Sequence, residues 1–323
     1  MKVFLFLTLL QFIFFSCTAS LPNIRNFKTG TYKNKLDIKA NSVRRNYLIH
    51  IPENFKSDDS YPLVIALHGA FSTAAEFEKQ TGFSVLADRE DFVVVYPNGA
   101  YGIFGFLQHW NAGHCCGKAV RDSLDDIAFI HKTIESVKSI VRVDTTRIYM
   151  LGFSNGGMLT QYFAAQNSGN LAAIAALAAP LTSKPSEEAK EWPVPKPKYN
   201  IPVIYFHGRA DQNMPYAGGK SIHHGGSREY FSAKQTVQFW LDNNSINVRS
   251  SCDTLNQGSV IRERWTCQKS GSEVMFYSFD KWPHQWPGRY FTGKLPDNNP
   301  LKDFEATEII WEFFRIHKRE SMN

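Results

Sequence analysis

The sequence Gly-Phe-Ser-Asn-Gly at 152–156 constrains this chain more than any other feature. An apolar run at 147–151 precedes it and predicts a buried strand, and the segment 157–165 after it predicts a helix. A serine at a sharp turn between strand and helix is typical of a nucleophile elbow, where glycines let the helix approach the sheet closely. The Ser154 hydroxyl then lies at a helix N-terminus, which favours a developing negative charge. The simpler interpretation is a serine that only caps the helix.

Strands and helices alternate through the centre of the chain. Strands are predicted at 61–67, 92–96, 147–151, 172–178 and 202–206, and helices at about 74–89, 123–141 and 157–165. This alternation indicates a mainly parallel sheet with helices on both faces. Four prolines in the segment 183–200 disfavour a helical lid. We therefore expect an α/β fold, in a single domain over residues 21–323 without a large lid.

Further elements are predicted on either side of this alternating core. Residues 29–52 alternate between polar and apolar and predict opening antiparallel strands, and 260–265 with 273–279 predict a hairpin. Ser232 and Gln235 form a capping-box pattern for a helix that reaches about residue 243. A last helix is predicted at about 303–317.

The charge pattern bears on the class of partner. The 323 residues carry a net charge of +6, and the basic residues are scattered along the chain. Nucleic-acid-binding domains concentrate basic residues on one face, so no nucleic-acid partner is expected. After the N-terminal segment no run is long and apolar enough to cross a bilayer, and we expect a monomer without stable membrane insertion.

Residues 1–20 have the pattern of a signal peptide. Lys2 precedes an apolar run at 3–15, and small residues follow at 16–20. The run is too short to span a bilayer comfortably, so cleavage near residue 19 or 20 predicts a secreted protein. Cys17 leaves a second interpretation open, because residues 14–17 loosely resemble a bacterial lipoprotein box in which the cysteine carries a lipid anchor.

Four cysteines follow this segment, an even number that fits an oxidising compartment. Cys252 and Cys267 bracket a predicted strand, and we expect them to form a disulfide worth about 3 kcal/mol in the chain-entropy model. Cys115 and Cys116 leave three interpretations open, which are a vicinal disulfide, two thiols, or pairing elsewhere. No Cys/His spacing suggests a zinc site, so no metal is expected.

Acyl transfer by a serine needs a base and a carboxylate that orients the base. In the fold that carries nucleophile elbows, the acid and then the histidine follow the serine along the chain. Asp211 comes directly behind the predicted strand 202–206 and is our candidate acid. Asp242 and Asp253 compete, but neither follows a strand's carboxyl end, and the simpler interpretation of Asp211 is a turn residue.

His284 is the candidate base, because it lies in the loop after the predicted strand 273–279. It stands between Trp282 and Trp286, so the alternative is a half-buried packing residue. Five other histidines compete less well for this role. His223 and His224 lie in a glycine-rich loop, His317 in a terminal helix, and His68 and His207 at strand ends where they would order loops.

The oxyanion of the tetrahedral intermediate needs two backbone donors. The first expected donor is the N–H of Asn155, directly after the nucleophile. The second should come from the loop after strand 61–67, where Gly69 permits close approach. We expect Ala70 to supply it, with Phe71 as the alternative.

Several ordered stretches resemble the polyhydroxybutyrate depolymerase and feruloyl esterase group of α/β hydrolases over about residues 45–314. They are Leu-His-Gly at 67–69, Val-Tyr-Pro-Asn-Gly at 95–99, Trp-Asn-Ala-Gly at 110–113 with Cys-Cys-Gly at 115–117, Asp-Asp at 125–126 with Phe129, residues 152–158, His-Gly at 207–208 with Asp211, Pro-Tyr at 215–216 with Gly-Gly at 218–219, and His284 with Trp-Pro-Gly at 286–288. So many ordered matches are far more specific than the pentapeptide alone.

This resemblance implies a secreted serine esterase that acts on polymer-linked or hydroxyacyl esters, with a triad of Ser154, Asp211 and His284. The group usually has glycines just before the catalytic histidine, whereas this chain has Trp282 and Pro283. That difference stiffens the loop and bears on substrate identity more than on catalysis.

We therefore expect an esterase that works through an acyl-enzyme and needs no cofactor. A feruloyl-type esterase on plant cell-wall polysaccharide is the first expectation, a polyester depolymerase the second and an acetylxylan esterase the third. The aromatic residues expected to stack on substrate, unless they only pack, are Trp110, Trp282 and Trp286, with Phe104 and Phe106. The competing classes are a serine peptidase on the same fold and a catalytically inactive carbohydrate-binding or adhesion module, which would be expected to lack a triad member.

Overall fold

The computed structural model describes residues 29–37, 44–100, 107–184, 190–221, 228–247, 252–290 and 293–320. The predicted signal peptide with Cys17, the aromatic residues Phe104 and Phe106, and the histidines His223 and His224 lie outside the described residues. No helix within the described ranges has the length and apolar character that crossing a membrane requires.

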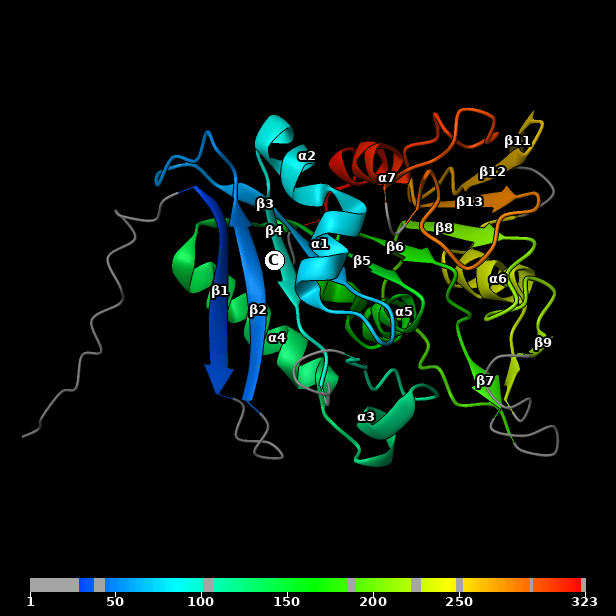
Figure 1. Ribbon diagram of the computed structural model, residues 1–323, viewed down its shortest axis with the longest axis horizontal. Coiled ribbons are helices and arrows are strands. Elements are labelled where there is room, and N and C mark those ends of the chain that lie inside the picture. Colours follow the sequence, from blue (N-terminus) through cyan, green and yellow to red (C-terminus); the bar gives the residue numbers. More distant parts are fainter. Residues whose placement is uncertain are drawn as a thin grey trace, which may run out of the picture.

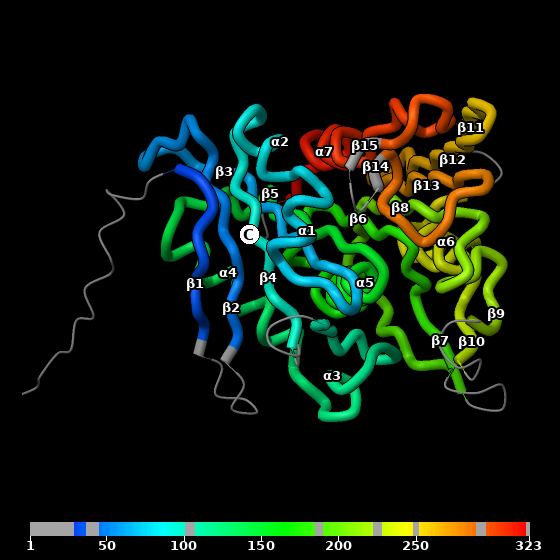
Figure 2. Tube along the Cα trace, viewed as in Figure 1, coloured from blue at the N-terminus to red at the C-terminus, as the bar shows by residue number. Residues whose placement is uncertain are grey.

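One sheet forms the centre of the described part of the molecule (Figure 1). Its strands, in spatial order, are β1 (Gly30–Asp37), β2 (Arg44–Ile51), β4 (Val93–Pro97), β3 (Tyr61–Leu67), β5 (Val143–Phe153), β6 (Ala173–Leu177), β8 (Val203–Gly208), β13 (Glu273–Phe279), β12 (Val260–Thr266) and β11 (Cys252–Gln257). Neighbours from β4 to β13 are parallel. The two strands at each margin, which Figure 2 shows at opposite sides of the molecule, pair antiparallel.

Helices cover both faces of this sheet. One face carries α1 (Ala74–Thr81), α2 (Phe83–Glu90) and α7 (Ala306–Arg315), and the other carries α4 (Asp126–Ile140), α5 (Asn155–Asn167) and α6 (Ala233–Asn243). The side chains of β3 alternate between the two hydrophobic layers, with Leu63 and Ile65 in one and Val64 and Ala66 in the other. Burial on both faces explains why the central strands read as continuous apolar runs. The expected α/β architecture is confirmed.

Short elements complete the described chain. They are α3 (Gly117–Arg121), the 3₁₀ turn η3 (Ser168–Asn170), a small sheet of β7 (Ser183–Lys184), β10 (Glu229–Tyr230) and β9 (Gly219–Lys220), and the pair β14 (Arg289–Tyr290) and β15 (Gly293–Lys294). The proline-rich segment 183–200 contains no helix in its described residues, as expected.

Two of the longer elements differ from expectation. The helix predicted at 74–89 is two helices, because Gly82 adopts φ 67° and its N–H caps α1 by donating to the Glu78 carbonyl. The strand β11 was not predicted, since its residues are exposed along its whole length and lack an apolar period.

The predicted disulfide between Cys252 and Cys267 is wrong, because both cysteines are free. In the register of β11 and β12, Cys252 faces Trp265, so Cys267 is displaced from it by two positions. Diagonal neighbours in an antiparallel pair lie about 7–8 Å apart, which exceeds the usual Cα separation of a disulfide. Cys115 and Cys116 instead form a vicinal disulfide, one of the three interpretations left open by the sequence.

A buried ion pair joins the antiparallel margin to α4. An Arg45 nitrogen lies 2.7 Å from the Asp126 carboxylate, and both side chains are almost completely buried. The guanidinium also donates to the Asn98 carbonyl and lies 4.0 Å from the centre of the Phe129 ring. The second Asp126 oxygen accepts from the backbone N–H of Asn111 at 2.7 Å. The pair therefore fixes the two ends of the loop that follows β4.

Replacing Arg45 by Met should destabilise the protein by about 3–5 kcal/mol, because the Asp126 carboxylate then stays buried without its cation. Urea unfolding monitored by tryptophan fluorescence measures this loss. The double variant Arg45→Met/Asp126→Asn removes both charges and should lose less than Arg45→Met alone. A single-variant loss below about 1 kcal/mol would show that water reaches the carboxylate.

Candidate active site

Ser154 lies at a strained turn between β5 and α5. Its backbone has φ 52° and ψ −123°, a conformation that residues other than glycine rarely adopt. Steric overlap excludes any residue other than glycine at the neighbouring positions 152 and 156. A Cβ on Gly156 would lie 2.3 Å from the Leu67 carbonyl oxygen, and one on Gly152 would lie 2.3 Å from the Gly156 oxygen. The turn therefore has the geometry of a nucleophile elbow.

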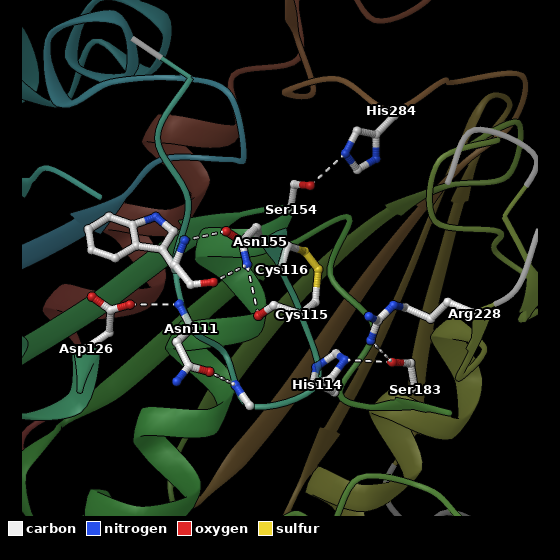
Figure 3. Close-up of a disulfide and its surroundings, with 12 residues drawn as sticks. Asn111, His114, Cys115, Cys116, Asp126, Ser154, Asn155, Ser183, Arg228 and His284 are labelled. Carbon is white, nitrogen blue, oxygen red and sulfur yellow. Dashed lines mark hydrogen bonds between the residues drawn. A yellow bond between two sulfur atoms is a disulfide. The ribbon is translucent and has the colours of Figure 1, made fainter. Parts of the chain in front are cut away.

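The three predicted triad residues lie together. Ser154 Oγ is 2.9 Å from His284 Nε2, and His284 Nδ1 is 2.6 Å from Asp211 Oδ2. Figure 3 shows the Ser154 hydroxyl directed at the imidazole ring. Each residue follows the carboxyl end of a parallel strand, namely β5, β8 and β13. Parallel strands end at one edge of the sheet, which brings together residues distant in sequence.

Asp211 is held by its own loop. One carboxylate oxygen accepts from the N–H groups of Asn213 and Met214 at 2.9 and 2.8 Å. The other oxygen accepts from His284 Nδ1–H, which leaves Nε2 free to accept the serine proton. The carboxylate is fully buried, so it has no alternative orientation in solvent.

His207 orders the same loop, as expected for a histidine at a strand end. Its Nε2–H donates to the Met214 carbonyl at 2.7 Å, and its Nδ1 lies 2.7 Å from the Tyr205 hydroxyl. Burial lowers the pKa of His207, although the Asp211 carboxylate opposes that shift. His207 therefore supports the loop of the acid through its bonds to Tyr205 and Met214.

Ala70 and Asn155 both line the cavity beside Ser154. The N–H of Asn155 occupies the first position of α5, where a helix offers it no acceptor. The competing donor, Phe71 N–H, already donates to the Gln108 carbonyl at 2.8 Å. Ala70 therefore remains the better candidate for the second oxyanion donor.

His68 fixes the loop that carries Ala70. The N–H of Gly99 donates to His68 Nε2 at 2.9 Å, so the ring proton lies on Nδ1, which donates to the Gly69 carbonyl at 2.7 Å. Burial lowers the pKa of His68 to about 4, so the ring is neutral near pH 7. The sequence-based expectation that His68 orders a loop is confirmed.

The side chain of Asn155 also holds the loop at 110–115, a role that the sequence analysis did not predict. Its Oδ1 accepts from Trp110 N–H at 2.8 Å, and its Nδ2 donates to the carbonyls of Trp110 and Cys115 at 3.2 and 3.3 Å. Asn155 thus holds the loop that carries the vicinal disulfide, as Figure 3 shows. Both cysteines line the cavity. The nearest sequence signal is the shared Trp-Asn-Ala-Gly and Cys-Cys-Gly stretches, which give no distance from Ser154.

A cavity of about 450 Å³ opens at Ser154 and His284. Its lining is mostly neutral and consists of Ala70, Phe71, His109, Cys115, Cys116, Gly117, Ser154, Asn155, Asn213, Met214, Arg228, Tyr230 and His284. A space of this size accepts a small acyl or aryl group.

The predicted stacking tryptophans do not line this cavity, so that assignment is wrong. Trp110 is fully buried, donates to the His68 carbonyl at 2.8 Å and stacks on Phe129. Trp282 is 4% exposed, and Trp286 is fully buried in the layer of α1, α2 and α7. Their rings fill the core because a buried indole contributes a large apolar area.

Comparison with known proteins shows which families of enzymes this chain is similar to. Residues 46–182 match the model of a family described as esterase PHB depolymerase. Feruloyl esterase B of Piromyces equi is 31% identical over 201 residues, which cover 62% of this chain and 35% of that protein. Poly(3-hydroxyalkanoate) depolymerase C of Paucimonas lemoignei is 30% identical over 121 residues, or 36% of this chain and 27% of that protein. The chain therefore spans about a third of these relatives.

An acetyl xylan esterase from Aspergillus awamori aligns with a TM-score of 0.56 at 14% identity, over 79% of this chain and 94% of that chain. The fold is that of the α/β hydrolases. Within that class, the chain is similar to the polyhydroxybutyrate depolymerase and feruloyl esterase group, as the sequence motifs indicated.

Acid should weaken the fold through His68. The folded protein resists protonation of His68 down to about pH 4, whereas the unfolded chain binds that proton near pH 6.5. The free energy of unfolding should therefore fall from about pH 6.5 to 4, by roughly 1.4 kcal/mol per pH unit for this group. The variant His68→Gln keeps an acceptor for Gly99 N–H and should have a shallower slope in urea unfolding. Equal slopes in both proteins would contradict this assignment.

Proposed function

We propose that this protein is a serine carboxylesterase that works through an acyl-enzyme. The observation that carries the proposal is the continuous hydrogen-bonded chain from Ser154 through His284 to Asp211, with the serine at the wall of a cavity. The names of the relatives, which are esterases and a polyester depolymerase, support the same reaction class.

In the proposed reaction, Ser154 Oγ attacks the ester carbonyl carbon while its proton passes to His284 Nε2. The N–H groups of Asn155 and Ala70 stabilise the oxyanion, and each such donor contributes about 3–4 kcal/mol to the transition state. Asp211 orients the imidazole and stabilises the imidazolium. His284 then protonates the departing alcohol, and water repeats the sequence on the acyl-enzyme to release the acid. These steps need no cofactor.

We propose a feruloyl-type ester of plant cell-wall polysaccharide as the first substrate, with polyhydroxyalkanoate and acetylated xylan as alternatives. The proline-rich segment 183–200 supplies no helical lid in its described residues, and a cavity without such a lid suits the end or side group of a polymer. A polymeric substrate outside the cell requires export, so we also propose that residues 1–20 direct secretion.

Replacing Ser154 by Ala should abolish both the burst and the turnover of 4-nitrophenyl butyrate, because no acyl-enzyme can form. Stopped-flow absorbance of the released 4-nitrophenol measures this. Ser139→Ala, at an exposed position on α4, is the matched control and should leave the burst intact. Turnover by Ser154→Ala equal to that of wild type would exclude Ser154 as nucleophile, whereas no turnover by wild type would favour a non-catalytic protein.

Asp211→Asn should preserve the fold but lower kcat about ten-thousandfold. The amide oxygen stays with the N–H groups of Asn213 and Met214, so the amide nitrogen donates to His284 Nδ1 and holds the ring in the wrong tautomer. Steady-state kinetics with circular dichroism as the folding control test this effect. A loss below tenfold would mean that another carboxylate orients the base.

The natural ester class is tested by comparing kcat/KM on methyl ferulate with product release from acetylated xylan and from poly(3-hydroxybutyrate). Clear preference for methyl ferulate is the expected result, because the cavity accepts an aryl group. Preference for either of the other two would replace the first substrate without affecting the proposed reaction.

A further inference from the structure

Arg228 is a charged residue in an otherwise neutral wall. It precedes β10 and lines the cavity that contains Ser154 and His284 (Figure 3). Among the described residues that line this cavity there is no Asp, Glu or Lys, and the catalytic candidate His284 is bonded to Asp211. A guanidinium stays protonated at any working pH, so the cavity carries a permanent positive charge.

The groups that hold Arg228 are neutral. Its Nη1 donates to the Ser183 hydroxyl at 3.2 Å, and that hydroxyl oxygen lies 3.0 Å from His114 Nδ1. His114 is buried, and burial together with the charge of Arg228 lowers its pKa to about 3, so it adds no compensating charge. Within the described residues no carboxylate forms an ion pair with Arg228. The neighbouring Glu229 instead has Lys184 as its ion partner, at 4.0 Å.

A fixed cation in a partly enclosed, neutral cavity favours a ligand of opposite charge. A guanidinium has five N–H groups, and in Arg228 the Nη1 atom donates to Ser183. The remaining N–H groups can donate two parallel hydrogen bonds to a carboxylate. Low local dielectric strengthens such a pair relative to the same pair in water. A neutral ester gains nothing from the charge, so the residue discriminates between substrates.

We propose that Arg228 binds a carboxylate carried by the substrate, so that this site prefers esters with a free carboxylate over neutral esters of the same length. The proposal rests on the proposed esterase function and names a substrate feature of the same site. The carboxylate has two sources. It belongs to the acyl part, as in a half-ester of a dicarboxylic acid, or to the alcohol part, as in an ester of a hydroxy acid.

Two substrate pairs separate these sources. Mono-4-nitrophenyl adipate against 4-nitrophenyl hexanoate tests the acyl side, and 4-butyryloxybenzoate against phenyl butyrate tests the alcohol side. For at least one pair, the ratio of kcat/KM for the anionic ester to that for the neutral ester should fall about tenfold or more in Arg228→Gln. The same ratio should fall in wild type as salt rises. Turnover of neutral esters should change less than about twofold.

The choice of variants distinguishes recognition from a structural role. Glutamine keeps a donor for Ser183 but has no charge, whereas Arg228→Lys keeps the charge and should retain part of the preference. Lys132→Gln removes an exposed charge on α4 and should leave every ratio unchanged. If Arg228 only fixes β10 through Ser183, Arg228→Gln lowers turnover of anionic and neutral esters alike, and the proposal is overturned.

A binding measurement separates failure of this proposal from failure of the proposed function. Calorimetric titration of Ser154→Ala with adipate needs no turnover. Affinity at least tenfold weaker in Ser154→Ala/Arg228→Gln supports a carboxylate site even if wild type hydrolyses none of the esters. Equal affinity in the two proteins overturns the proposal if the kinetic ratios are unchanged, or if wild type hydrolyses none of the esters.

Discussion

The close contact of α5 with the sheet is the constraint on which the site depends. A side chain at Gly152 or Gly156 would overlap backbone atoms, so only glycine lets the helix begin directly after β5. This contact forces Ser154 into a positive-φ conformation. The surrounding packing offsets the cost of that conformation, because β3 and β6 on either side of β5 and the first turns of α5 are buried. In this conformation the serine hydroxyl lies 2.9 Å from His284 Nε2.

The loops around this turn are irregular, and hydrogen bonds from buried polar side chains hold them where no regular backbone hydrogen bonding does. Asn155 bonds both ends of the segment 110–115, and the Arg45–Asp126 pair fixes the segments at Asn98 and Asn111. Each of these groups would be costly to leave unpaired in the interior. The core therefore fixes the positions of the loops that line the cavity, as the proposed stabilisation of an oxyanion requires.

The electrostatics of the region follow from burial. His68, His114 and His207 are buried with lowered pKa values, so they act as neutral donors and acceptors that order loops. The charged groups at the site are then few, chiefly the Asp211 carboxylate behind His284 and the Arg228 guanidinium across the cavity. In neutral, partly buried surroundings each of these charges interacts more strongly with an opposite charge than it would at an exposed surface.

The sequence alone determined the layered α/β arrangement, the elbow and the candidate triad. Apolar runs on both faces of a strand, glycine spacing and residue order are local properties, and each triad candidate directly follows a strand. Only the tertiary structure decided whether a large aromatic side chain packs in the core or faces the cavity. Trp110, Trp282 and Trp286 are large enough to pack or to stack, and their burial depends on helices far along the chain. The register of β11 on β12 separated Cys252 from Cys267, because pairing between strands is set by contacts that no local pattern encodes.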